Sequence, residues 1–430
     1  MKIKSMIHSQ KSSGFQGEIT IPGDKSISHR AIMLGALADG ISEIHNSSLG
    51  NDCMSTIHCF QKMNIEITLH ENHLLIHGKG LHGLSQAPGS LYVGNSGTTA
   101  RLLSGILSGQ DFSSILLGDH SLNTRPMERI ITPLTLMGST ISSVNHNGCA
   151  PLSIHPSALH GIHYQSKIAS AQVKSALLLA GLYANEPTSF TEPFSSRNHT
   201  ELMLSDFGCS VQTTEHTTTL CPITQLQRTN LSIPGDISSA AYLIAGALLL
   251  PHSELLIKDV GINPTRSGFL NICKQMGGDI TIINTTIKNQ EPRADLLVCS
   301  SSLHGIVIEG SVIPTLIDEL TIIAIMAAFA SGTTTIKDAS ELRVKESDRI
   351  QTISQNLLAM GGSITTSEDG MTIHGGIPLH GAYINSQKDH RIAMAFTIAA
   401  LAAEGSSTIS DSACVKVSYP DFYETLSSLL

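Results

Sequence analysis

Residues 19–26 read ITIPGDKS, and residues 231–238 read LSIPGDIS. The two copies start about half of the 430-residue chain apart, and each is followed by a stretch rich in small apolar residues. A repeat of this kind predicts two halves of related design. The expected hinge lies at the two IPGD segments. One domain is then formed by residues 1–21 and 236–430, and the other by residues 22–235.

A finer period runs inside both halves. Amphipathic helical stretches close with similar endings: QKMNIEI at 61, LMGSTI at 136, SDFGCSV at 205, KQMGGDI at 274 and LAMGGSI at 358. The Gly or Asn in each ending suits the left-handed backbone that terminates a helix, and a strand-like stretch follows. A sixth helix, DFYETLSSLL, ends the chain without a following strand. The strand GEITIPG at 17–23 is expected to fill that gap.

A second set of helices lies between these. They are expected to begin near Asp24, Asn95, Ser170, Asp236, Asp318 and Lys388. Stretches such as DELTIIAIMAAFASG are apolar on nearly every face, which is typical of buried helices. The sequence therefore predicts a mixed α/β protein of six β-α-β-α-β-β units, three in each domain.

Composition excludes several functional classes. The apolar fraction is 41% and the net charge is −9, so the chain is not of the disordered class. The same negative charge disfavours a nucleic-acid-binding surface. Apolar runs of about a dozen residues are shorter than the roughly 20 that a membrane-spanning helix needs. The absence of an apolar signal sequence and the eight dispersed cysteines predict a cytoplasmic protein with free thiols.

The basic residues are concentrated near the expected N-termini of the helices. More than half of the 26 Lys and Arg residues lie near the twelve expected helix starts. A helix N-terminus carries partial positive charge, so cations are unfavourable there unless an anion completes the site. For any one of these residues, ordinary surface ion pairing is the favoured explanation. The whole set favours a binding site for anions.

The motifs, taken in order, carry a resemblance. They are GDKSISHR (23–30), GNSGTTAR (94–101), NTRPMER (123–129), SAQVK (170–174), SRNHTE (196–201), PGD (234–236), IDELT (317–321), RVKESDR (343–349) and DHR (389–391). Together they resemble the 5-enolpyruvylshikimate-3-phosphate synthase family, its class II subgroup more than class I.

The resemblance implies an activity and a fold. The family transfers the enolpyruvyl group of phosphoenolpyruvate to the 5-hydroxyl of shikimate 3-phosphate and releases phosphate, in the shikimate pathway of aromatic amino acid biosynthesis. It uses no metal and no organic cofactor. The implied fold is the two-domain enolpyruvyl transferase fold, an inside-out α/β barrel with buried parallel helices and the active site in the cleft between the domains. A monomer is expected.

The resemblance also implies roles for matching residues. The expected phosphoenolpyruvate ligands are Lys25, Gly97, Arg125, Gln172, Arg349, His390, Arg391 and Lys416. The expected shikimate 3-phosphate ligands are Lys25, Ser26, Arg30, Ser170, Ala171, Gln172, Arg197, Asp318 and Lys345. Asp318 accepts the proton of the attacking hydroxyl, and Glu346 protonates the methylene carbon. Lys25 is the other acid–base candidate. An acid and a base in different electrostatic settings suit this chemistry.

Two alternatives stay open at this point. The sister enzyme that acts on UDP-N-acetylglucosamine shares the fold but usually carries a Cys shortly before the residue matched by Arg125, where this chain reads GDHSLNTR. A non-catalytic sugar-phosphate binding protein needs no acid–base pair such as Asp318 and Glu346.

Gly97 is unsubstituted at the position whose Ala variant protects class II enzymes from the inhibitor glyphosate. Some sensitivity to glyphosate is therefore expected.

Overall fold

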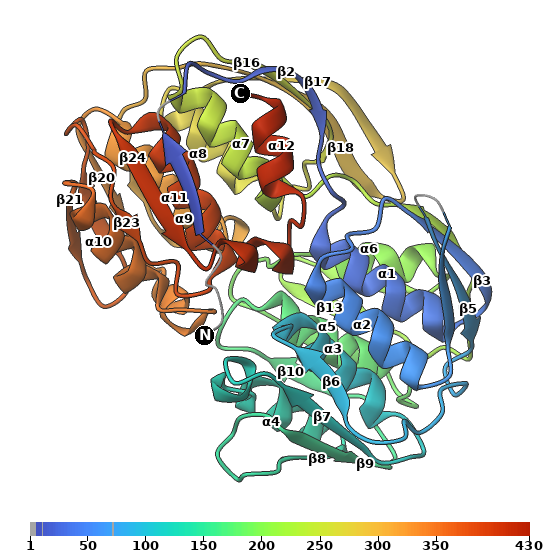
Figure 1. Cartoon of the computed structure of the whole chain (residues 1–430). Coiled ribbons are helices and arrows are strands. Elements are labelled where there is room, and N and C mark those ends of the chain that lie inside the picture. The colour runs from blue at the N-terminus through green and yellow to red at the C-terminus, as the bar shows by residue number, and fades with distance from the viewer. Residues whose placement is uncertain (1–5, 11, 71–72) are drawn as a thin grey trace. The chain divides into compact units, whose positions relative to one another are not determined.

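The chain forms two compact units. A computed structural model describes residues 6–10, 12–70 and 73–430 (Figure 1). Unit 1 comprises residues up to Pro22, residues 234–286 and residues 292–430, and unit 2 comprises residues 23–233 with residues 287–291. None of the described helices combines the length and apolar character that crossing a membrane requires.

Unit 2 is built from small mixed sheets and the helices that connect their strands. Its elements are, in chain order, α1 (Lys25–Leu37), β3 (Ala38–His45), α2 (Asn51–Lys62), β4 (Glu66–His70), β5 (His73–Lys79), β6 (Leu91–Gly94), α3 (Gly97–Ser108), β7 (Ser114–Gly118), α4 (Glu128–Leu136), β8 (Thr140–Ser143), β9 (Leu152–His155), β10 (His163–Gln165), α5 (Ala171–Gly181), β11 (Thr188–Thr191), α6 (His199–Asp206), β12 (Val211–Thr214), β13 (Thr217–Leu220), β14 (Leu226–Gln227) and β15 (Asn230–Ser232). The sheets have the orders β6-β7-β9-β8, β10-β11-β13-β12 and β14-β3-β5-β4, with β15 also on β3. Each contains a parallel pair followed by antiparallel pairs.

Unit 1 repeats this plan. Its elements are β1 (Met6–Gln10), β2 (Gln16–Thr20), α7 (Ile237–Leu249), β16 (Glu254–Gly261), α8 (Gly268–Gln275), β17 (Asp279–Lys288), β18 (Glu291–Cys299), β19 (Val307–Ile308), α9 (Leu320–Phe329), β20 (Thr333–Ile336), α10 (Arg349–Ala359), β21 (Ser363–Thr366), β22 (Met371–His374), β23 (Tyr383–Ile384), α11 (His390–Ala402), β24 (Ser406–Ser410) and α12 (Phe422–Ser428), with 3₁₀ turns η3 (Ser340–Val344) and η4 (Ser412–Val417). The sheet orders are β17-β18-β16-β2, β19-β20-β22-β21 and β1-β24-β23. The expected mixed α/β class is confirmed.

The two sets of helices have the expected burial. In α9 every residue from Leu320 to Ala328 is buried, and α7 and α11 are buried almost throughout. These three helices contact one another and form the centre of the unit 1 core. In unit 2, α1, α3 and α5 take the same place. A Cβ on Gly105 of α3 would lie 2.2 Å from the carbonyl oxygen of Ala176 in α5, so this close approach requires glycine.

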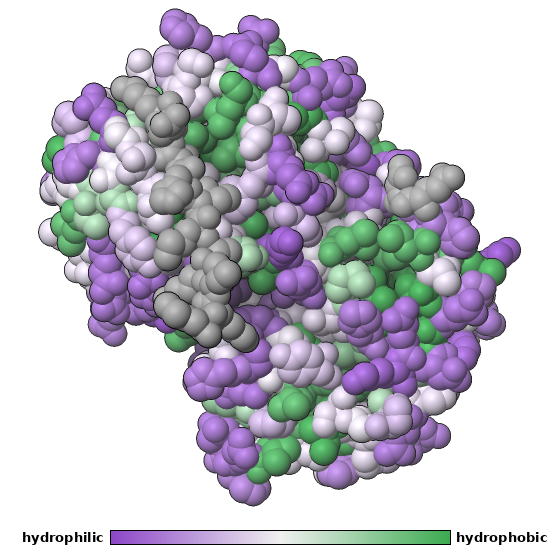
Figure 2. All heavy atoms as spheres, in the orientation of Figure 1, coloured by the Kyte–Doolittle hydropathy of each residue, from purple (hydrophilic) through white to green (hydrophobic). Residues whose placement is uncertain are grey.

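The amphipathic helices end as the sequence predicts. A residue with a positive φ angle follows each of the helices α2, α4, α6, α8 and α10. These residues are Asn64, Gly138, Gly208, Gly277 and Gly361. The face of the molecule in Figure 2 is covered mainly by hydrophilic and intermediate residues, and apolar residues show in separate groups. The apolar helices therefore supply the interior and the amphipathic helices cover it.

The expectation for the N-terminal strand was wrong. Residues 17–23 do not complete the last sheet, because β2 pairs in parallel with β16. The partner of β24 is β1, which pairs with it antiparallel from Met6↔Ser410 to Gln10↔Ser406. Both strands of the N-terminal segment are thus used, each in a different sheet of unit 1. No strand was predicted for residues 6–10 from the sequence.

A hairpin tip joins unit 2 from a distant part of the sequence. Residues 287–291 comprise the end of β17, the two-residue turn and the first residue of β18. The carboxylate oxygen Oε1 of Glu291 lies 2.6 Å from Nδ1 of His199, and both side chains are buried. Gln290 donates to the Asp206 carboxylate at 3.1 Å, and Asn289 accepts from the backbone N–H of Ser232 at 3.0 Å.

Candidate active site

In unit 1 the starts of several helices meet around Asp318. Its carboxylate oxygens lie 3.7 Å from Nη1 of Arg349, 3.7 Å from Nη2 of Arg391 and 3.8 Å from Nη1 of Arg266. Arg349 opens α10, Arg391 lies in the first turn of α11, and Arg266 precedes α8. One partly exposed carboxylate is therefore surrounded by three guanidinium groups, which suits an anionic ligand or a base kept ionised.

The second carboxylate of the predicted acid–base pair joins the same cluster. Oε2 of Glu346 lies 2.5 Å from Nη2 of Arg349, and the Glu346 side chain is 21% exposed. Nε of Arg349 donates to Oδ2 of the fully buried Asp389 at 2.8 Å. Asp389 also caps α11 by accepting from the backbone N–H of Arg391 at 2.9 Å. Asp389 thereby fixes the positions of both arginines.

The charges of this cluster support one another. Burial alone raises the pKa of Asp389, but the attraction of Arg349 outweighs it and the pKa is lowered. Burial lowers the pKa of Arg391, and the attraction of Asp318 outweighs it, so that this pKa is raised well above its ordinary value. Asp389 is thus ionised and Arg391 protonated near neutral pH.

The other predicted residues of unit 1 lie on neighbouring elements. His390 is the first residue of α11 and is buried. Nζ of Lys345 lies 3.2 Å from Oε1 of the exposed Glu341. Lys416 lies on η4, a turn that packs against α11.

In unit 2 a second cluster forms at the starts of α1, α3 and α5. Nζ of Lys25 lies 2.9 Å from Oδ2 of Asp52. Nη1 of Arg197 donates to the hydroxyl of Ser26 at 3.4 Å. Arg30 is 3% exposed, and its nitrogens donate to the Ser26 carbonyl at 2.8 Å and to the hydroxyls of Ser175 and Thr200. Burial lowers the pKa of Arg30 to about 10, so this residue stays charged near pH 7.

A chain of contacts extends this cluster to Gly97. Nη1 of Arg101 donates to Oε1 of Gln172 at 2.7 Å, and Gln172 donates to the hydroxyl of Thr98 at 3.1 Å. A Cβ on Gly97 would lie 2.8 Å from Nη1 of Arg101 and 3.5 Å from Nη1 of Arg125. The backbone at the start of α3 therefore faces two guanidinium groups with no side chain between them, and such an arrangement suits an anion.

The start of α5 completes the unit 2 cluster. Ser170 caps this helix, because its hydroxyl accepts from the backbone N–H of Val173 at 3.4 Å. Ala171 is the first helical residue, and its carbonyl accepts from the hydroxyl of Ser175 at 2.6 Å. The same hydroxyl accepts from Arg30, which connects α5 to α1.

A family model described as EPSP synthase (3-phosphoshikimate 1-carboxyvinyltransferase) matches residues 9–426. The chain belongs to the EPSP synthase family. It is a 3-phosphoshikimate 1-carboxyvinyltransferase, a transferase of aromatic amino acid biosynthesis through the shikimate pathway. The resemblance drawn from the motifs is confirmed.

Relatives with this name match nearly the full length of the chain. The 3-phosphoshikimate 1-carboxyvinyltransferase of Thermoanaerobacter sp. (strain X514) is 50% identical over 423 residues, 98% of this chain and 100% of the relative. That of Brevibacillus brevis is 49% identical over 421 residues, 98% of this chain and 99% of the relative. A solved structure of EPSP synthase from Acinetobacter baumannii matches with a TM-score of 0.88 and 43% identity, covering 99% of this chain and 98% of that one.

The sequence reasoning missed several residues that organise the two clusters of this EPSP synthase. Asp389, Arg266 and Arg101 were not proposed as site residues, although each contacts one that was. Arg266 and Arg101 stand near the starts of α8 and α3, but their partners lie far away in sequence. Asp389 stands immediately before His390 and Arg391, and its capping position was the available signal.

A buried histidine gives this EPSP synthase a pH-dependent stability. His29 in α1 is fully buried, and Nδ1 lies 2.7 Å from the hydroxyl of Thr56. Burial, with Lys25 and Arg30 nearby, lowers the pKa of His29 well below its ordinary value. Below about pH 6.5, His29 therefore binds a proton in the unfolded chain, whereas in the folded chain it stays neutral until the pH reaches its lowered pKa. Stability is full above that pH and falls as the pH drops toward the folded pKa.

We expect His29→Gln to remove this contribution. Between pH 7 and pH 5 the free energy of unfolding of the parent should fall relative to that of His29→Gln, by at most about 1.4 kcal/mol per pH unit. Denaturant unfolding curves at three pH values measure the difference. A difference between the two proteins that does not change with pH would contradict the prediction.

Proposed function

We propose that the enzyme joins phosphoenolpyruvate to the 5-hydroxyl of shikimate 3-phosphate through a tetrahedral intermediate. The observation that carries the proposal is Asp318 among three arginines, with Glu346 on one of them. We assign shikimate 3-phosphate to Lys25, Ser26, Arg30, Ser170, Ala171, Gln172, Arg197, Asp318 and Lys345. We assign phosphoenolpyruvate to Lys25, Gly97, Arg125, Gln172, Arg349, His390, Arg391 and Lys416.

The proposed chemistry needs one base and one acid. Asp318 accepts the proton of the attacking 5-hydroxyl while Glu346 protonates the methylene carbon of phosphoenolpyruvate. The adduct that forms carries both the phosphate and the new ether bond. Elimination reverses the proton transfers: Glu346 takes a proton back from the methyl group, the C–O bond to phosphate breaks, and Asp318 gives its proton to the departing phosphate. Lys25 is the third acid–base candidate, and arginines stabilise the negative charge that builds up on the phosphate.

The direct test is phosphate release from defined substrate pairs. The enzyme should release phosphate from phosphoenolpyruvate with shikimate 3-phosphate as acceptor, and not with UDP-N-acetylglucosamine. Release with the UDP-sugar alone would overturn the assignment in favour of the sister activity. Binding of shikimate 3-phosphate without any release would favour a binding protein.

We expect glyphosate to inhibit the enzyme and Gly97→Ala to weaken that inhibition. The added Cβ would stand 2.8 Å from Nη1 of Arg101 and push it away from Gln172. Because Gly97 and Gln172 are both assigned to phosphoenolpyruvate, this displacement should also raise the KM for phosphoenolpyruvate, by about tenfold, which corresponds to about 1.4 kcal/mol. Initial rates against both ligands measure the effect. An inhibition curve of the parent that stays flat to millimolar glyphosate would refute the first expectation.

We also propose the finer architecture that the motifs implied. Both units follow the inside-out α/β barrel plan, with domains at residues 1–21 with 236–430 and at residues 22–235. The order β6, α3, β7, α4, β8, β9 and its repetition from β10 to β13 support three β-α-β-α-β-β repeats in a unit. We further propose a cytoplasmic monomer, which size-exclusion chromatography with light scattering would test.

A further inference from the structure

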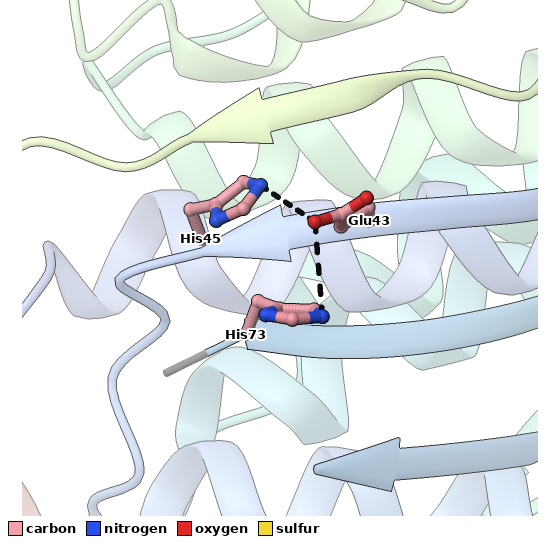
Figure 3. A group of neighbouring side chains, drawn as sticks. All are labelled: Glu43, His45 and His73. Carbon is pink, nitrogen blue, oxygen red and sulfur yellow. Dashed lines mark ion pairs between the residues drawn. The ribbon is translucent and has the colours of Figure 1, made fainter. Parts of the chain in front are cut away.

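A group of two imidazoles and a carboxylate lies on β3 and β5 of unit 2, apart from both clusters described above. His45 and His73 are directly paired across these antiparallel strands, and Glu43 is two residues before His45 (Figure 3). Because side chains alternate along a strand, Glu43 and His45 share a face. Ile44, between Glu43 and His45, and Leu74, directly after His73, are buried in the core. Their side chains point to the opposite face, so the group lies on the outer face of the sheet.

The donor atoms of this group converge. Oε1 of Glu43 lies 2.9 Å from Nε2 of His45 and 3.7 Å from Nε2 of His73. One ligand atom from each residue lies within 4.8 Å of the others. Figure 3 shows both rings directed at the same carboxylate oxygen. Two donors bound about 2.1 Å from one zinc ion lie about 3.0–3.4 Å apart, so only small side-chain rotations are needed to bind one.

We propose that Glu43, His45 and His73 form a binding site for a divalent transition-metal ion of the zinc type. Imidazole ligands favour Zn²⁺ and its neighbours, whereas Mg²⁺ and Ca²⁺ prefer sites made of oxygen atoms. The side chains of His45, Glu43 and His73 are 48%, 32% and 25% exposed, so water has access to the remaining coordination positions. The ion replaces the contacts that both rings make to Glu43.

Neighbouring groups strengthen this assignment. His70 of β4 is paired with His73, and the centroids of the two rings lie 6.2 Å apart. The rings of His45 and His73 lie 5.2 Å apart. Three imidazoles from three adjacent strands therefore form a row beside one carboxylate. A surface ion pair needs one histidine at most, whereas a metal site uses several.

The site lies where the chain leaves unit 2. The carbonyl of His45 accepts from the backbone N–H of Ile233 at 3.0 Å, and the side chain of Asn46 donates to the Ile233 carbonyl at 3.0 Å. Ile233 is the last residue of the main segment of unit 2. An ion that links the end of β3 to β5 thus restrains β3, and the segment at Ile233 is hydrogen-bonded to the end of that strand. Metal binding should therefore raise the thermal stability of the chain.

The test is a titration of the metal-free full chain with Zn²⁺ by calorimetry. We expect one saturable site that His45→Ala and His73→Ala each weaken about 100-fold or more, since even residues that only support a ligand change affinity about 10–100-fold. Glu43→Gln, which keeps the side-chain shape, should also weaken it. The matched control is His77→Ala on the same face of β5, which should bind as the parent does.

A second readout guards against misfolded variants. The Tm of the parent and of His77→Ala should rise with Zn²⁺, and that of Glu43→Gln should rise much less. Mg²⁺ should not displace Zn²⁺. An isotherm of Glu43→Gln or His45→Ala identical to that of the parent would overturn the proposal, as would the absence of saturable binding. In either case the three residues form an ordinary surface ion-pair group.

Discussion

Replacing Glu346 with Gln is expected to lower kcat by about 100- to 10,000-fold, the usual contribution of a general acid–base group. The amide cannot deliver a proton to the methylene carbon. In the parent, Nη2 of Arg349 lies 2.5 Å from Oε2 of Glu346. The amide oxygen of the glutamine can accept the same hydrogen bond from Arg349. The arginine and the fold around it should therefore persist. Steady-state rates and calorimetric binding of shikimate 3-phosphate measure turnover and binding separately.

The control for this variant is Glu309→Gln. Glu309 is an exposed carboxylate of unit 1 that pairs with Lys337 at 2.7 Å, and it belongs to neither cluster. Its kcat should equal that of the parent. If Glu346→Gln keeps near-normal turnover, Glu346 is not the proton donor, and Lys25 becomes the leading candidate. If substrate binding is lost together with turnover, the role of Glu346 is to position Arg349.

The largest expected loss of stability follows from Lys174→Met. Nζ of Lys174 lies 2.8 Å from Oε1 of Glu192 and 2.7 Å from Oε1 of Glu201, and all three side chains are at least nine-tenths buried. Burial lowers the pKa of Lys174, but the two carboxylates outweigh it and the pKa is raised. Methionine would leave the carboxylates of Glu192 and Glu201 buried without the ammonium group that both of them contact. Breaking a buried ion pair in this way costs about 3–5 kcal/mol.

The matched control is Lys337→Met, which removes an exposed lysine from its pair with Glu309. Exposed ion pairs contribute little, so its unfolding midpoint should match that of the parent. Denaturant unfolding followed by circular dichroism compares the three proteins. Equal midpoints for Lys174→Met and the parent would show that Glu192 and Glu201 are protonated or solvated when the lysine is absent.

Local signals in the sequence predicted the elements well. The helix starts expected near Asp24, Ser170 and Asp236 coincide with residues that cap α1, α5 and α7 through their side chains. Capping and apolar periodicity depend on neighbouring residues, so they can be read without knowledge of the fold. Strand pairing depends on residues hundreds of positions apart. For this reason the sequence did not reveal that β1, and not β2, pairs with β24.

The clusters show the same limit. Basic residues at helix starts could be recognised one by one, and the structure joins Asp318, Arg349 and Arg391 as members of one group. The pairing of Arg349 with Asp389 could not be recognised, because the two residues are 40 positions apart, although Asp389 itself stands at a helix cap. Likewise the histidines looked scattered in the sequence. Only the register of β3 against β5 places His45 beside His73.

The pairing of β1 with β24 has a consequence for synthesis on the ribosome. Residues 6–10 are made about 400 residues before Ser406–Ser410, the strand with which they pair. At roughly 5–20 residues per second, this leaves the N-terminal segment waiting for tens of seconds. Residues 23–233 are contiguous and are complete long before. Residues 23–233 can therefore fold while β1 is still without its partner strand, and the sheet of β1 and β24 closes only after β24 has been made.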